Sequence, residues 1–112
     1  MRILIVDDDP SKYKHLMSYS PTFTTSKPDT YKLLQGLTFD VVFVNTKFNE
    51  DFVNRIRSFD PYVPVFLVNF TNDGKGIVEY ASLIDGYLIN VDQVARTIER
   101  LISKFHYANV CV

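Results

Sequence analysis

Polar side chains follow four short apolar runs of this 112-residue sequence. Three acids, Asp7, Asp8 and Asp9, follow the first run, and one asparagine follows each of the other three. Three of the runs, 3–6, 41–44 and 65–68, are apolar throughout, and such runs predict buried parallel strands, whose carboxyl ends meet at one edge of a sheet where ligands bind. We therefore expect a single pocket built from Asp7, Asp8, Asn45, Asn69 and Asn90.

The chemistry of this pocket depends on its charges. Carboxylate oxygens suit Mg²⁺, and amide oxygens are weaker ligands, so Asp7 and Asp8 predict a magnesium site that is weak or absent. If both acids are buried without a cation, repulsion between like charges should raise the pKa of one of them. Asparagine both donates and accepts hydrogen bonds, so amides around two acids also favour a closed cluster that needs no ligand.

The segments around these residues predict alternating strands and helices. Apolar runs predict the strands, and apolar residues spaced by three and four predict the helices. The expected strands are 2–6, 23–25, 39–44, 65–68 and 86–89. The first expected helix follows Asp9 and Pro10 and carries Tyr13, Leu16 and Met17. The other expected helices are 31–37, started by Pro28 and Asp29, then 52–59, after a cap at Asn49, then 77–84 and 91–105. This order predicts an α/β fold with a parallel sheet covered by helices on both faces.

Four segments carry a resemblance to a known family. They are ILIVDDDP at 3–10, FDVVFVN at 39–45, PVFLVN at 64–69 and DGYLIN at 85–90. In order and spacing they resemble the receiver domain of two-component response regulators, across essentially the whole chain. The resemblance implies a flavodoxin-like, doubly wound sheet with strand order 2-1-3-4-5. It also implies one receiver-like domain over residues 1–112, with no output domain attached.

The resemblance assigns a role to each pocket position. Receiver domains bind magnesium through an acidic pair, which matches Asp7 and Asp8. An aspartate after the third strand accepts a phosphoryl group, and here that position holds Asn45. A Ser or Thr after the fourth strand matches Asn69, or Thr71 if the register shifts by two. A lysine after the fifth strand matches Asn90.

The substitutions predict a degenerate receiver, a pseudo-receiver. An acyl phosphate needs a carboxylate nucleophile, and the amide oxygen of Asn45 is too weak a nucleophile to form one. Phe70 stands where the family prefers a very small residue, so its ring should crowd the space above the pocket.

Purely structural interpretations stay open for several of these residues. The acids could simply end the first strand and cap the next helix, and Asn45 could be an ordinary turn residue that tolerates left-handed geometry. For Asn90 a structural role is favoured, because Gln93 three residues later predicts a helix N-cap with a capping-box partner.

Aromatic residues mark a candidate partner surface on the last strand and its flanking helices. They are Tyr80, Tyr87, Phe105 and Tyr107. Aromatic side chains are enriched at protein interfaces, so we predict that a protein partner docks here. Tyr87 also matches the switch aromatic of receiver domains, although a half-buried strand tyrosine explains it equally well. The apolar C-terminal tail makes a homodimer possible.

Composition limits the other classes of function. Twelve basic and thirteen acidic residues give a net charge of −1 and no strong field to attract nucleic acid or an anionic membrane. Cys111 is a single cysteine, and His15 and His106 lie far apart, which excludes an internal disulfide and structural zinc. The sequence has no signal peptide or membrane span, so we predict a cytoplasmic protein.

These observations favour a non-enzymatic, stand-alone pseudo-receiver that acts as a phosphorylation-independent interaction module in signalling. The alternative is a receiver still switched at the acidic pocket by magnesium, a small anion or phosphorylation at a non-standard residue such as Asp8. A small nucleotide-binding enzyme has no support, because the chain has no Gly-rich phosphate loop and only four glycines.

Overall fold

The apolar runs form the strands of one sheet. The computed structural model describes residues 1–71, 73–74 and 81–110, with side chains described to residue 104. In chain order the elements are β1 (Ile3–Val6), the 3₁₀ helix η1 (Pro10–Tyr19), β2 (Thr22–Thr24), α1 (Lys27–Gly36), β3 (Val41–Asn45), α2 (Glu50–Phe59), β4 (Val65–Val68), β5 (Gly86–Leu88) and α4 (Val91–Val110). The predicted strands are confirmed to within one or two residues at their starts and ends.

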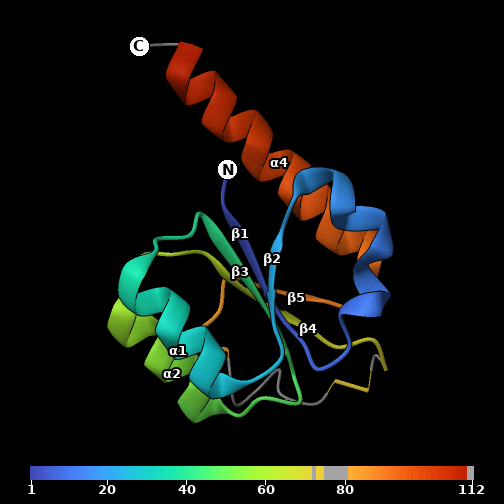
Figure 1. Ribbon diagram of the computed structural model, residues 1–112. Helices are drawn as coiled ribbons and strands as arrows, with labels where there is room; N and C mark the ends of the chain where they lie inside the picture. The colour runs from blue at the N-terminus through green and yellow to red at the C-terminus, as the bar shows by residue number, and fades with distance from the viewer. Residues whose placement is uncertain (72, 75–80, 111–112) are drawn as a thin grey trace.

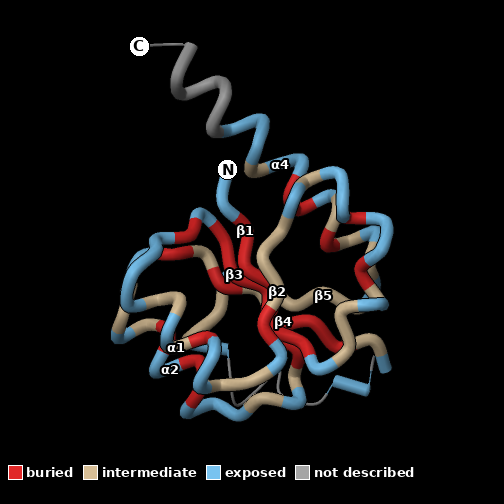
Figure 2. Tube along the Cα trace, viewed as in Figure 1, coloured by how far each residue is buried: buried red, intermediate tan, exposed pale blue. Residues whose placement is uncertain are grey.

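The five strands form one parallel sheet in the order β2-β1-β3-β4-β5. Ile5 pairs with Phe43, which pairs with Phe66, so the three central strands lie in register. This is the order 2-1-3-4-5 that the resemblance implied. Strands β1, β3 and β4 are almost wholly buried at the centre of the domain (Figure 2).

Alternate residues of each strand face different helical layers, as the pleat of a strand requires. Leu4 and Val6 pack in a cluster with Phe52, Val53 and Ile56 of α2, and α1 adds half-buried residues to it. The opposite face, with Ile3 and Ile5, packs against η1 and α4. Figure 1 shows the two layers, with α1 and α2 on one side of the sheet and η1 and α4 on the other.

Side-chain caps fix where three helices begin. Asp9 accepts a hydrogen bond from Ser11 N at the start of η1, and Asn49 accepts one from Phe52 N at the start of α2, as the sequence predicted. Helix α1 differs from the prediction. It begins at Lys27 after a Ser26 cap, one residue before Pro28. Proline then occupies the first turn, where its missing N–H costs no hydrogen bond.

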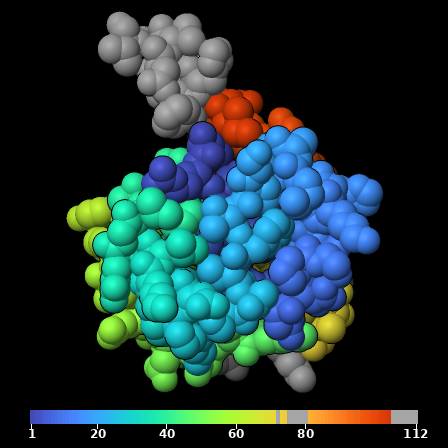
Figure 3. Space-filling view, viewed as in Figure 1, coloured from blue at the N-terminus to red at the C-terminus, as the bar shows by residue number. Residues whose placement is uncertain are grey.

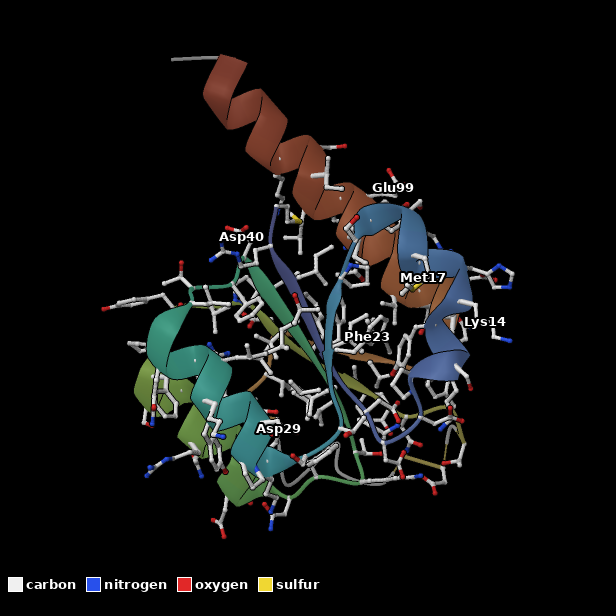
Figure 4. The ribbon with its side chains drawn as sticks, in the orientation of Figure 1. Lys14, Met17, Phe23, Asp29, Asp40 and Glu99 are labelled. Atoms are coloured by element: carbon white, nitrogen blue, oxygen red, sulfur yellow. The ribbon has the colours of Figure 1, made fainter. Side chains whose placement is uncertain are left out.

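The prediction that Met17 belongs to the buried stripe was wrong. The segment is a 3₁₀ helix, in which residues three apart share a face, so Tyr13 and Leu16 point into the core together. Met17 lies one position further round and is 58% exposed. Figure 4 shows it on η1, together with Lys14, whose side chain points away from the domain.

Two further expectations changed in the structure. Leu37 lies beyond the end of α1 and is exposed, because the helix stops at Gly36. The helix predicted over 77–84 is only partly testable. Residues 81–83 form a turn, and residues 77–80 lie outside the described residues. Leu83 and Ile84 nevertheless pack against the cluster on the α1 and α2 side, as buried positions of that segment should.

Helix α4 is longer than the strands it covers and continues past the edge of the sheet (Figure 1). Its first half is anchored by the buried Val94 and Ile98. Glu99 accepts a hydrogen bond from the Tyr19 hydroxyl at the end of η1, which ties the two helices together. Figure 4 shows Glu99 on α4 beside η1, and Figure 3 shows the blue and cyan N-terminal part of the chain covering most of the visible face. Within the described residues, no helix is long and apolar enough to cross a membrane.

Candidate functional site

Asp7 is the buried centre of the polar cluster at the carboxyl edge of the sheet. It follows β1 directly and is completely inaccessible to solvent. Its Oδ2 accepts hydrogen bonds from the Tyr13 hydroxyl at 2.7 Å and from Asn45 Nδ2 at 2.9 Å, and its Oδ1 accepts one from Asp9 N at 3.0 Å. Three donors within the protein therefore compensate the burial of this carboxylate.

Tyr13 makes this arrangement possible. Its ring is fully buried, and it contacts Phe23 at 6.0 Å and Phe70 at 5.6 Å between ring centroids. Burial, reinforced by the hydrogen bond to Asp7, raises the pKa of the Tyr13 phenol above its usual range. The hydroxyl therefore remains a proton donor to Asp7 throughout the physiological pH range.

Asn45 is the last residue of β3, and its side-chain amide makes hydrogen bonds through both its nitrogen and its oxygen. Its Nδ2 donates to Asp7, and its Oδ1 accepts from Lys47 N at 2.9 Å. The second bond closes a turn of the kind asparagine favours. Asn45 is thus both a turn residue and a member of the cluster, although its φ is not left-handed, since Ser20 is the only described non-glycine residue with positive φ.

Asp8 differs from Asp7 in its exposure and in its main partner. It is exposed, and its two carboxylate oxygens accept hydrogen bonds from Lys47 Nζ at 2.8 and 3.1 Å. This ion pair holds the pKa of Asp8 below its ordinary value and raises that of Lys47. The expectation of a raised pKa assumed that both acids are buried, and Asp8 does not meet that condition.

Asn69 and Thr71 both reach the pocket from the loop after β4. Asn69 is buried, and its Oδ1 accepts from the backbone N–H and the hydroxyl of Thr71 at 3.1 and 2.6 Å. Its Nδ2 donates to Asp73 at 2.7 Å and to the Tyr87 hydroxyl at 2.6 Å. The choice between Asn69 and Thr71 therefore does not arise, because the two side chains form one hydrogen-bonded unit.

A cavity of about 260 Å³ lies beside these residues at the carboxyl edge of the sheet. Its walls come from η1 and from the loops after β3 and β4: Lys12, Asn45, Thr46, Lys47, Asn69, Phe70, Thr71 and Asp73. The Lys12 ammonium lies 5.3 Å from the centroid of the Phe70 ring. Phe70 thus forms part of the wall, as the sequence predicted.

Asn90 is placed differently from the other predicted pocket residues. It is exposed, and its Oδ1 accepts a hydrogen bond from Gln93 N at 2.8 Å at the start of α4. Gln93 Oε1 accepts one from Ile89 N at 2.6 Å, so the two side chains form a reciprocal cap. Asn90 does not line the cavity, and the interpretation as a helix cap describes it better than membership of the pocket.

The predicted partner surface is described only in part. Tyr87 is half-buried on β5, and its hydroxyl binds Asn69. Tyr80 lies outside the described residues. Phe105 and Tyr107 belong to α4, and their side chains lie outside the described part of the chain.

Sequence reasoning missed two residues that complete the site, Tyr13 and Lys47. The apolar stripe of η1 hid Tyr13, because a buried tyrosine six residues after Asp7 looked like core packing. Lys47 stood in the turn directly after Asn45, where a basic side chain is in reach of the acidic pair at the neighbouring strand end. That position was the available signal.

The donor set does not fit a tightly bound magnesium ion. Mg²⁺ requires six oxygen ligands at close range and favours carboxylates. Both Asp7 oxygens already accept hydrogen bonds within the protein, Asp8 faces an ammonium, and Asn45 offers its oxygen to Lys47 N. Among the described residues, no group of three or more His, Cys, Asp or Glu side chains is arranged to hold a metal ion.

Comparison with known proteins places this geometry in a fold family. No protein-family model and no curated protein matches the sequence. Solved structures do match, and those compared below share 18% of their residues with this chain. The chemotaxis response regulator CheY4 of Vibrio cholerae has a TM-score of 0.72 and 18% identity over 89% of this chain and 97% of its own.

Two other structures agree over similar lengths. The receiver domain of a sensor histidine kinase from Pseudomonas aeruginosa, with magnesium coordinated in its active-site cleft, has a TM-score of 0.71 and 18% identity over 91% of this chain and 97% of its own. A structure described as an adenylate cyclase from Rhodopirellula baltica has a TM-score of 0.75 and 18% identity over 97% of this chain and 92% of its own. At these identities the likeness establishes the fold, and the chain has the fold of the response regulator receiver domains.

Proposed function

We propose that this protein is a pseudo-receiver: a signalling regulator that keeps the receiver fold, does not accept a phosphoryl group at the usual position, and acts by binding another protein. The receiver fold supports a role in signalling. The absence of phosphoryl transfer and the protein partner are the proposal.

The observation that carries the proposal is the amide of Asn45. It stands at the carboxyl end of β3, where the resemblance places the phosphoryl acceptor, and it is buried. An amide oxygen has no negative charge to attack phosphorus, and this one already accepts the Lys47 N–H. The neighbouring Nδ2 donates to Asp7, which leaves the group no freedom to turn.

The other positions of the phosphoryl site support the same conclusion. The Thr71 hydroxyl donates to Asn69 and is therefore occupied within the protein. The side chain at the lysine position, Asn90, caps α4. The bulky ring of Phe70 lines the cavity, where the resemblance favours a very small residue. The side chains at the hydroxyl and lysine positions thus each have a structural partner within the protein.

Phosphotransfer is tested by incubating the full chain with acetyl phosphate and Mg²⁺ and measuring its intact mass. The proposal predicts an unchanged mass, while a receiver domain that has the acceptor aspartate, treated in parallel, gains a phosphoryl group. A stable gain of one phosphoryl group that disappears in Asp8→Asn would overturn the proposal and favour the alternative, a receiver switched at the acidic pair. A gain that persists in Asp8→Asn and is lost on mutation of another acid would also overturn it.

Output through a protein partner is the second part of the proposal. The edge strand β5 is only half-buried, and Tyr87 on it is joined to the pocket residue Asn69. A partner that contacts β5 and α4 would therefore meet a surface whose aromatic residue is held in place from inside the domain. Aromatic side chains fixed in this way lose little entropy on binding.

The partner surface is tested by comparing proteins captured from the native host by the wild type and by Tyr87→Ala. Tyr62→Ala is the matched control, because Tyr62 is 91% exposed on the loop between α2 and β4. We expect Tyr87→Ala to lose specific partners that Tyr62→Ala retains. Equal recovery by all three proteins would mean that the proposed face is wrong.

A further inference from the structure

We infer that Lys47 is a built-in counterion of the acidic pair, and that its ammonium takes the place a divalent cation would occupy beside Asp8. The inference goes beyond the proposed function, because it concerns how the charge of the site is neutralised. It would hold whether or not Asn45 accepts a phosphoryl group.

The Lys47 ammonium contacts both carboxylate oxygens of Asp8. Lys47 Nζ lies 2.8 Å from one Asp8 oxygen and 3.1 Å from the other, so the ammonium bridges the carboxylate as a bound cation would. A cation that displaced Lys47 would not gain Asp7 as a second ligand. Asp7 is buried, and both its oxygens accept hydrogen bonds from the protein.

The turn after β3 delivers Lys47 to this position. Thr46 N donates to Val68 O at 3.0 Å, Lys47 N to Asn45 Oδ1 at 2.9 Å, and Phe48 N to Asn45 O at 3.1 Å. These three bonds fix the backbone of Lys47 relative to the ends of β3 and β4. The side chain needs only to extend across to the loop after β1 to reach Asp8.

Electrostatics explains why an ammonium at this place opposes a divalent cation. A charge of +2 held about 4 Å from a charge of +1 is disfavoured by roughly 30-fold in affinity even at the dielectric constant of water. The side chains of Lys47 and Asp8 are 58% and 51% exposed, so the pair can open. A divalent cation therefore competes with Lys47 for Asp8, and the inference predicts weak binding that strengthens when the lysine charge is removed.

The test is a titration of the full chain with Mn²⁺, followed by the electron paramagnetic resonance signal of the free ion. Lys47→Met keeps most of the length of the side chain and removes its charge, and we expect it to bind Mn²⁺ at least about tenfold more tightly than the wild type. Lys47→Gln should behave in the same way and guards against misfolding of a single variant. Adding Asp8→Asn to Lys47→Met should abolish the gain.

Lys12→Met is the matched control, because Lys12 lines the same cavity and its ammonium lies over Phe70. Its loss should change Mn²⁺ affinity less than threefold. Equal gains in Lys12→Met and Lys47→Met would mean that general charge, and not the position of Lys47, sets the affinity, which would overturn the inference. Wild-type binding as tight as that of Lys47→Met, or no binding by any variant, would overturn it too.

Discussion

Replacing Asn45 by aspartate should make the domain markedly less stable at neutral pH, although it restores the side chain that a phosphoryl acceptor requires. In the wild type, Asn45 Nδ2 donates to the buried Asp7 carboxylate at 2.9 Å. In Asn45→Asp a second carboxylate takes the place of that donor. The variant therefore loses a hydrogen bond and gains a repulsion between like charges in a site shielded from water.

Two estimates of the cost agree. Unit charges about 4 Å apart repel by about 4 kcal/mol at an effective dielectric constant of 20. The pair can instead keep one proton, and holding a carboxyl protonated at pH 7 against an ordinary pKa near 3.9 also costs about 4 kcal/mol. We expect Asn45→Asp to lower the free energy of unfolding by about 3–4 kcal/mol at pH 7.

The loss of stability in Asn45→Asp should depend on pH. The folded variant binds more protons than its unfolded chain between about pH 4 and 7, so its stability falls as the pH rises through that range. At pH 4 the protonated carboxyl can again donate to Asp7, and the difference from the wild type should shrink to below about 1 kcal/mol. Urea unfolding followed by far-ultraviolet circular dichroism at pH 4, 5.5 and 7 measures this difference.

Asn49→Asp is the control for the same chemical change. Asn49 is the exposed N-cap of α2, where a negative charge is favourable, so this variant should match the wild type within about 0.5 kcal/mol. An Asn45→Asp protein as stable as the wild type at pH 7, or one whose deficit does not shrink on acidification, would show that Asp7 and Asn45 are not coupled as described.

Three further predictions concern the elements that hold the site. Arg57→Ala should lower the free energy of unfolding by about 2–4 kcal/mol in the same urea experiment. The Arg57 guanidinium donates to three backbone carbonyls, those of Leu83, Pro61 and Val63, and pairs with Asp85. As a control, replacing the exposed Arg55 by alanine should cost less than about 1 kcal/mol. Asn90→Ala should cost about 1 kcal/mol of stability through its lost helix cap and leave the mass after acetyl phosphate treatment unchanged. Any excess in the free energy of unfolding of the wild type over Lys47→Met should be present at pH 7 and lost as the pH falls below about 4. The reason is that Lys47 lowers the pKa of Asp8 in the folded protein. An excess that grows on acidification would contradict this pairing.

The sheet could be predicted because its signal is local. Val41, Val42, Phe43 and Val44 are an unbroken apolar run rich in β-branched residues, which is typical of a strand covered on both faces. Its carboxyl end had to meet that of β1, so the approach of Asn45 to Asp7 followed from the fold, although the two residues are 38 positions apart. The helix at η1 was misjudged because an α-helical spacing was assumed where the chain forms a 3₁₀ helix.

The hydrogen-bond partners of the site could not be predicted in the same way. Whether Tyr13 turns its hydroxyl toward Asp7, and whether Lys47 crosses to Asp8, depends on side-chain directions that the tertiary packing sets. The sequence predicted two acids in one pocket. The structure separates them into a buried carboxylate held by a tyrosine and an asparagine and an exposed one held by a lysine.

The most direct test of the closed site is a nuclear magnetic resonance titration with beryllofluoride, a mimic of the phosphoryl group, in the presence of Mg²⁺. The side-chain amide signals of Asn45 and Asn69 report on the two hydrogen bonds that close the pocket, to Asp7 and to Tyr87. We predict that neither signal moves as the reagent is added. A saturable shift of the Asn45 amide would mean that the pocket opens to a tetrahedral anion, and would contradict the account.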